Sequence, residues 1–196
     1  MQRKKTEIRK EEIKKAVLEI IANEGLSKLS TKNLAEKVGI SEGAIFKHFR
    51  SKRDILLSIM EDVKLDLQNA LRNISIEITP AEKRFRKFLC AHIDYLYHHQ
   101  GITIFLFSEA AHMDDALIKE QLSNILKEQK LLVSKIVHDG KSEGVFNKEV
   151  NEKDIATLYS GIPLSFNVEI VLNKNRFNVK KFCKTMYEQM MRILKN

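Results

Sequence analysis

The chain has few of the residues that interrupt helices or cross-link chains. Its 196 residues include two prolines and two cysteines, and no run of about 18 apolar residues occurs. Few prolines leave room for long helices, and the missing apolar run argues against a membrane span. The basic start, Met1 to Lys5, is followed by no apolar segment, so no signal peptide is expected. These absences predict a soluble, all-α, cytoplasmic protein.

The sequence also lacks the motifs of an enzyme. There is no glycine-rich phosphate loop, no nucleophile motif and no pair of carboxylates placed in a loop, and the seven glycines are interpreted as helix ends. We therefore predict no catalytic residue, no metal and no cofactor. Cys90 and Cys183 lie far apart on apolar helical faces. We interpret them as buried free thiols and expect no disulfide framework.

The segment from Thr31 to Lys52 has the pattern of a helix-turn-helix. Ser30 or Thr31 is a suitable N-cap, and Gly39 stands where a helix commonly ends in a left-handed conformation. Ser41 can then cap a second short helix. The apolar positions of the two helices are Leu34, Ala35, Val38, Ile45, Phe46 and Phe49. Two short helices joined around a glycine are typical of this motif.

Periodic apolar residues predict further helices along the rest of the chain. A first helix is expected over about 10–24, preceded by a polar arm at 3–9. Gly101 is expected to end one of the later helices. The remaining helices are predicted at about 52–74, 81–99, 102–113, 115–140, 152–172 and 178–194.

Most of the excess positive charge accompanies the helix-turn-helix. Residues 1–55 contain 14 Lys and Arg against 8 Asp and Glu, whereas the remainder contains 20 against 18. A basic surface beside a helix that can enter a groove is the electrostatic footprint of nucleic-acid binding.

The run from Gly39 to Phe49, with Ser51-Lys52 and Ile55-Leu56 after it, resembles the signature of the TetR (tetracycline-repressor) family. The motif covers about the first quarter of the chain, and the rest matches the family in length and helical character. The resemblance implies an all-α fold of about nine helices. It also implies a DNA-binding domain over 1–53 and a ligand-binding and dimerisation domain over 54–196.

By the same resemblance, the second helix of the motif enters the major groove of double-stranded DNA. The matched positions implied to contact DNA are Thr31, Ser41, Glu42, Gly43, Ala44, Phe46, Lys47, His48 and Lys52. Phe46 departs from the tyrosine usual in the family and cannot donate a hydrogen bond to a phosphate. Glu42 is acidic: it either favours the helix dipole, accepts from a cytosine amine or repels wrong sites.

The resemblance further implies a homodimer through the last two helices, a palindromic operator, and repression that a small, largely apolar effector relieves. Residues that combine aromatic walls with a few polar groups are candidates for the effector pocket. They are Phe88, His92, Tyr95, Phe105, Ser108, Glu109, Tyr159 and Phe166. Each of them is also compatible with ordinary core packing.

Two other functions stay open. One is a DNA-binding protein that answers to a protein partner or organises the chromosome without an effector. The weaker one is a metal sensor, for which His98, His99, Glu109 and His112 are the candidate ligands. Adjacent histidines point apart on a helix, which argues against a shared metal.

Overall fold

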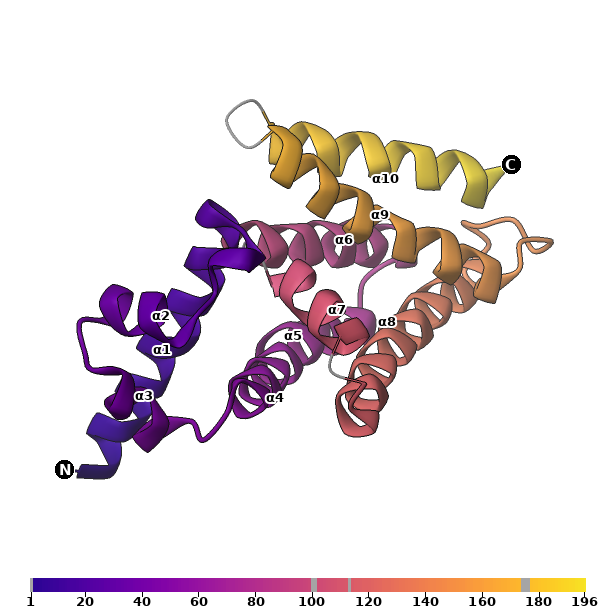
Figure 1. The fold of residues 1–196 in the computed structure, drawn as a ribbon. Helices are drawn as coiled ribbons and strands as arrows, with labels where there is room; N and C mark the ends of the chain where they lie inside the picture. The colour runs from indigo at the N-terminus through magenta and orange to yellow at the C-terminus, as the bar shows by residue number, and fades with distance from the viewer. Residues whose placement is uncertain (1, 100–101, 113, 174–176) are drawn as a thin grey trace. The chain divides into compact units, whose positions relative to one another are not determined.

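The computed structural model describes residues 2–99, 102–112, 114–173 and 177–196, and these residues form helices and no strand (Figure 1). Counting α4, η2 and α5 as one continuous helix, the described residues form nine helices and one 3₁₀ turn. Their bounds are α1 Gln2–Glu24, η1 Leu26–Lys28, α2 Thr31–Val38, α3 Glu42–His48, α4 Lys52–Asp62, η2 Val63–Gln68, α5 Asn69–Ser75, α6 Ala81–His98, α7 Ile102–His112, α8 Ala116–Ser142, α9 Glu152–Asn173 and α10 Val179–Lys195. The predicted all-α class is confirmed.

The helices divide into two compact units. The first unit comprises Met1–Asp62 and His99–Lys119, and the second comprises Val63–His98 and Glu120–Asn196. Gly101 was expected to end one helix, and Met113 was expected to lie in another. Both positions are outside the described residues. Within the described part of the chain, no helix is both long enough and apolar enough to cross a membrane.

In the first unit, α1 packs against α2, α3 and α7. Its predicted apolar stripe is buried and includes Ile13, Val17 and Ile20. The expectation of a non-helical arm at 3–9 was wrong, because α1 begins at Gln2. The arm has no apolar stripe, but Arg9 pairs with Glu12 one turn away, and such pairs support a polar helix end.

The predicted helix over about 52–74 is continuous but not uniform. Ser51 caps it, because its Oγ accepts a hydrogen bond from the amide of Asp54 at 3.2 Å. From Val63 to Gln68 the helix is π-helical. The Gln68 side chain is buried there and donates through Nε2 to the Ile125 carbonyl of α8 at 2.8 Å. A π segment widens the helix locally, and such segments are frequent at functional positions.

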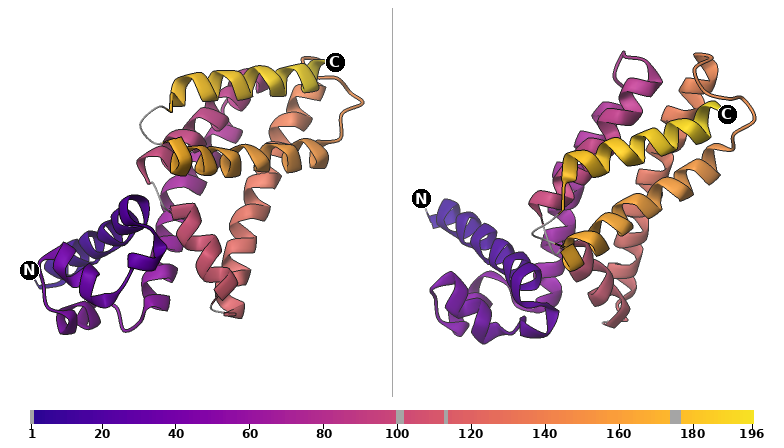
Figure 2. Two further views of the ribbon diagram at one scale, coloured as in Figure 1. Left: turned by 45° about the horizontal axis from the view of Figure 1, so that its top comes forward. Right: turned by 90° about the horizontal axis from the view of Figure 1, so that it is seen from above.

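In the second unit, α6 lies against α5, α9 and α10 (Figure 2). Its buried face contains Phe85, Phe88, Leu89 and Ile93. Buried Arg84 is fully engaged at the start of α6: it donates to the Ser75 carbonyl and pairs with the carboxylates of Asp139 and Glu143 on α8. These pairs fix the first turns of α6 against the end of α8.

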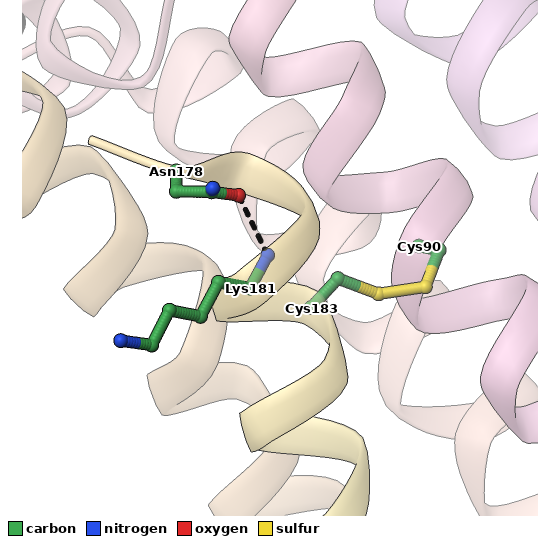
Figure 3. The surroundings of a disulfide bond; sticks show 4 residues. All are labelled: Cys90, Asn178, Lys181 and Cys183. Atoms are coloured by element: carbon green, nitrogen blue, oxygen red, sulfur yellow. Dashed lines mark hydrogen bonds between the residues drawn. A yellow bond between two sulfur atoms is a disulfide. The ribbon is translucent and has the colours of Figure 1, made fainter. Parts of the chain in front are cut away.

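Cys90 of α6 and Cys183 of α10 form a disulfide, with their Cα atoms 5.7 Å apart (Figure 3). The interpretation of the two residues as free thiols was therefore wrong. Both stretches are amphipathic, and the sequence alone does not show that their cysteines face each other across the α6–α10 contact.

Candidate nucleic-acid interface

Local hydrogen bonds define the two helices of the motif. Ser30 caps α2 by accepting a hydrogen bond from the amide of Asn33 at 3.1 Å. Gly39 ends α2 with φ 74°, a left-handed conformation that glycine adopts without steric cost. Ser41 caps α3 by accepting from the amide of Ala44 at 3.3 Å. The predicted helix-turn-helix is thus confirmed with its caps.

The second helix of the motif has a buried side and an exposed side. Ile45 within α3 and Phe49 at its C-cap are buried, and Ala35 of α2 packs in the same core. Ser41, Glu42, Gly43 and Lys47 are exposed, and Ala44 and His48 are half-buried. Glycine and alanine leave the α3 backbone accessible to a partner. The side of α3 away from the core therefore carries small residues and charged residues of both signs.

Phe46 belongs to the exposed side. We expected it to complete the apolar side of α3, and this was wrong, because 52% of the residue is exposed. Positions 45 and 49 are one turn apart and fill the core, whereas position 46 is turned about 100° from position 45. An exposed aromatic ring on a short helix is available to a partner molecule.

Two basic residues at the start of α4 have acidic partners within the first unit. Lys52 donates to the carboxylate of Glu109 in α7 at 2.8 Å, and the Glu109 side chain is only 7% exposed. Arg53 pairs with Asp115, which lowers the pKa of that carboxyl. The helical spacing did not predict either pair, because the partners are about sixty residues apart in the sequence. The pairs bind the first turn of α4 to the α7 region.

The candidate effector residues fall in both units. Phe105 is buried, Ser108 is half-buried and Glu109 binds Lys52, all in the first unit. The other candidates lie on two helices of the second unit: Phe88, His92 and Tyr95 on α6, and Tyr159 and Phe166 on α9. Phe166 contacts the rings of Phe177 and Phe182.

His92 and Tyr159 form a buried polar pair in the second unit. The Nδ1 atom of His92 lies 3.0 Å from the hydroxyl of Tyr159, and the rings of Phe85 and Phe88 stand edge-on to Tyr159. Burial lowers the pKa of His92 to about 4 and raises the pKa of Tyr159. Both groups are therefore neutral at pH 7. A neutral hydrogen-bonded pair among aromatic rings is compatible both with ordinary core packing and with a site for an apolar molecule that has one polar group.

The candidate metal ligands are not gathered into a site. In the described part of the chain no three His, Cys, Asp or Glu residues are grouped to hold an ion. His98 lies 3.5 Å from Asp94 on the exposed side of α6, and Glu109 is engaged with Lys52.

A capped helix-turn-helix with an exposed second helix, followed by a separate helical unit, defines a DNA-binding regulator as the class of protein. Residues 13–59 match the family described as bacterial regulatory proteins, tetR family. Residues 65–193 match the family described as YsiA-like protein, C-terminal region. The chain belongs to the TetR family of DNA-binding transcriptional regulators.

Two relatives by sequence are the nucleoid occlusion factor SlmA of Vibrio cholerae and the uncharacterized HTH-type regulator YerO of Bacillus subtilis. SlmA is 25% identical over 154 residues, which are 78% of this chain and 79% of SlmA. YerO is 25% identical over 167 residues, which are 84% of this chain and 57% of YerO.

Solved structures share the fold at lower identity. The ketosteroid regulator KstR2 of Mycobacterium tuberculosis has a TM-score of 0.80 at 16% identity, over 96% of this chain and 95% of that one. The fatty acid degradation regulator FadR of Bacillus halodurans has a TM-score of 0.74 at 17% identity, over 93% and 94%. At these identities the likeness shows the fold.

Proposed function

We propose that the protein is a ligand-responsive repressor that binds an inverted-repeat operator as a homodimer in the cytoplasm. The observation that carries the proposal is the exposed side of α3, where Gly43, Phe46 and Lys47 face away from the Ile45–Phe49 core. In the proposed complex α3 lies in the major groove. Lys47 then meets a guanine edge or a phosphate, and the Phe46 ring lies on sugars or a thymine methyl.

Other contacts position the helix without reading bases. Thr31 and Lys52 stand at the first turns of α2 and α4, where backbone amides favour a phosphate. His48 is the remaining candidate, and its buried Nδ1 atom has no hydrogen-bond partner among the described residues. A phosphate contact through the other ring nitrogen, Nε2, would leave Nδ1 unchanged. We propose that these residues set the register and that α3 reads the sequence.

The homodimer is proposed to use α9 and α10. The exposed side of α9 carries large apolar residues at helical spacing: Leu158, Leu164, Val168 and Leu172. Ile193 of α10 is exposed as well. A row of exposed apolar side chains along one helix is typical of an interaction surface, and a two-fold dimer covers the same patch on both copies. Two copies of α3 then meet two half-sites, as an inverted repeat requires.

The effector is proposed to be a small, largely apolar molecule whose polar group bonds to the His92–Tyr159 pair. That pair lies among Phe85 and Phe88 and carries no charge at pH 7. Relatives of the same fold are named as regulators of ketosteroids and of fatty acid degradation, which are processes with apolar substrates. Binding is proposed to weaken operator affinity by about 5- to 150-fold, the range of ordinary allosteric coupling.

The effector proposal is tested by titrating the purified protein with a steroid and with a long-chain fatty acyl compound. We expect one of them to raise the melting temperature and to release bound DNA. His92→Phe should abolish both effects, whereas Phe182→Leu, outside the His92–Tyr159 cluster, should keep them. Equal responses in the two variants would remove the basis for a site at His92.

The relatives named nucleoid occlusion factors favour a second candidate function. In it the protein binds many chromosomal sites and answers to a protein partner instead of a small molecule. Recovering genomic fragments bound by the protein separates the two candidates. A few promoter-adjacent inverted repeats support the repressor, and many sites dispersed over the chromosome support the alternative.

A further inference from the structure

The disulfide joins two helices of the second unit at one point. Cys90 and Cys183 are the only cysteines in the chain and lie 93 positions apart. Their Cα atoms lie 5.7 Å apart, a separation common among disulfides. Figure 3 shows the bond crossing from α6 to the second turn of α10. The bond is a single, direct covalent tie between these helices.

A permanent structural disulfide is unusual in a protein of this kind. A DNA-binding regulator acts beside the chromosome, where glutathione and thioredoxin keep thiols reduced. Disulfides found under such conditions are mostly transient, and they serve catalysis or redox sensing. Cys90 is only partly buried, so small thiols and oxidants have access to the pair from its side.

The start of α10 also suits sulfur exchange. Asn178 caps the helix by accepting from the amide of Lys181, as Figure 3 shows. Exposed Lys180 and Lys184 lie within one turn of Cys183. Nearby positive charge favours an anionic sulfur, and the thiolate is the species that attacks an oxidant or a disulfide.

The bond lies in the first half of α10, away from the end that polar contacts hold. The far end of α10 is tied independently, because Tyr187 and Lys195 both bind Glu82 of α6 at 2.9 and 2.8 Å. The Leu194 carbonyl there accepts a hydrogen bond from the Asn147 amide at 2.7 Å. In the first half of α10, the Phe182 ring packs with the rings of Phe166 and Phe177. Breaking the bond removes the covalent tie of the first half of α10 and leaves the polar contacts of its second half in place.

We propose that Cys90 and Cys183 are a reversible thiol–disulfide sensor, a second input besides the small-molecule effector. Oxidation by a hydroperoxide converts one thiolate to a sulfenic acid with release of an alcohol or water. The second thiol then displaces water and closes the disulfide. Reduction by two equivalents of a monothiol, or by one dithiol, restores both thiols and leaves the reductant as its disulfide.

The consequence for DNA binding rests on the proposed function, whereas the sulfur chemistry does not. If α10 is part of the dimer interface, the disulfide holds its first half in the shape that the partner copy meets. The oxidised protein then dimerises and binds its operator more tightly than the reduced protein. We expect a difference of about 5- to 150-fold in operator affinity.

The sulfur chemistry is tested on the full-length wild-type protein with no mutation. The protein is reduced, exposed to hydrogen peroxide or to glutathione buffers of graded ratio, and alkylated, and the free thiols are counted by mass spectrometry. We expect the pair to close and reopen completely, with a midpoint inside the range that glutathione buffers span. Thiols that stay free under oxidant, or a folded-state bond that glutathione and thioredoxin leave closed, would overturn the proposal.

The functional consequence is tested by measuring the dimer dissociation constant and operator affinity of both redox forms. Cys90→Ser/Cys183→Ser should behave as the reduced wild type and ignore oxidant, and circular dichroism checks its fold. The switch would be overturned if the two wild-type forms had equal dimer dissociation constants and operator affinities. It would also be overturned if the reduced form bound the operator more tightly. If neither form dimerises or binds a selected DNA site, the proposed function fails. The thiol titration then still shows whether the cysteine pair opens and closes reversibly.

Discussion

The ion pair between Lys52 and Glu109 leads to a prediction about both folding and DNA binding. Glu109 is almost fully buried, whereas 44% of the Lys52 side chain is exposed. Lys52→Met leaves the buried carboxylate without its cation. Breaking a fully buried pair costs about 3–5 kcal/mol, but exposure of Lys52 lets water reach this one. We therefore expect a loss of about 1–2 kcal/mol in the free energy of unfolding.

The pair is isolated by a double-mutant cycle with Glu109→Gln, measured by urea unfolding. Glutamine keeps an acceptor for Lys52 and removes the buried charge. Lys52→Met should therefore cost much less in the Glu109→Gln background than in the wild type. An equal cost in both backgrounds would show that the two side chains are not coupled, and the reasoning from burial would be refuted.

Operator binding gives the second measurement on the same variants. If Lys52 contacts a phosphate, a dimer of Lys52→Met loses two such contacts, and the slope of log K against log salt falls by about 2. Glu109→Gln frees Lys52 from its competing carboxylate and should strengthen binding by roughly fivefold, or about 1 kcal/mol. Lys148→Met, at an exposed position outside the helix-turn-helix, is the matched control. An unchanged slope in Lys52→Met would exclude the phosphate contact.

Three further predictions concern stability, pH and assembly. Gly39→Ala should lower the free energy of unfolding by about 1–2 kcal/mol, because φ is 74° there; calorimetry measures the loss, and none would contradict the left-handed cap. His92 is held neutral with a pKa of about 4, below its ordinary 6.5. The contribution of neutral His92 to the free energy of unfolding is complete above pH 6.5. It is lost as the pH falls below 6.5, because the unfolded state then takes up a proton. Between pH 7 and 4.5 the wild type should lose about 2–3 kcal/mol more than His92→Gln in urea unfolding, and parallel pH profiles would refute this. Val168→Glu should yield monomers in sedimentation equilibrium, because Val168 is 57% exposed on α9; Ser27→Glu is the control, and an intact dimer would exclude α9 from the interface.

The helix-turn-helix was predictable because local chemistry decides it. The cap at Ser30, the left-handed Gly39 and the cap at Ser41 are each signalled within a few residues and agree with the apolar spacing. Phe46 shows where that reasoning ends. A short helix has two aromatic residues but space for only one of them in the core, and the choice depends on the packing of α1 and α2.

Features that join distant residues could not be predicted in the same way. The partners of the Cys90–Cys183 and Lys52–Glu109 contacts lie 93 and 57 positions apart. Periodicity assigns each residue to a helical face but does not say which faces meet. The π segment at Val63–Gln68 was missed for a related reason, because its apolar residues also fit an ordinary α-helix. The start of α1 was missed because polar residues carry no periodic signal.

The contacts that individual residues make with DNA, and the domain boundary proposed at residue 53, stay predictions. The positions themselves are now defined: Gly43 and Lys47 are exposed on α3. Thr31 and Lys52 begin α2 and α4, the helices before and after it. The candidate effector residues are less well supported as a group. Among them, His92 and Phe88 both contact Tyr159 in the second unit.

The central claim, sequence-specific DNA binding by a dimer through α3, is tested most directly by footprinting on a genomic fragment that the protein selects. We predict a protected inverted repeat whose half-sites lie one helical turn, or a multiple of it, apart. Lys47→Ala should weaken protection of both half-sites together, and Lys148→Ala, at an exposed position between α8 and α9, should not. Protection of single, unpaired half-sites, or equal protection by the Lys47 variant, would contradict the account.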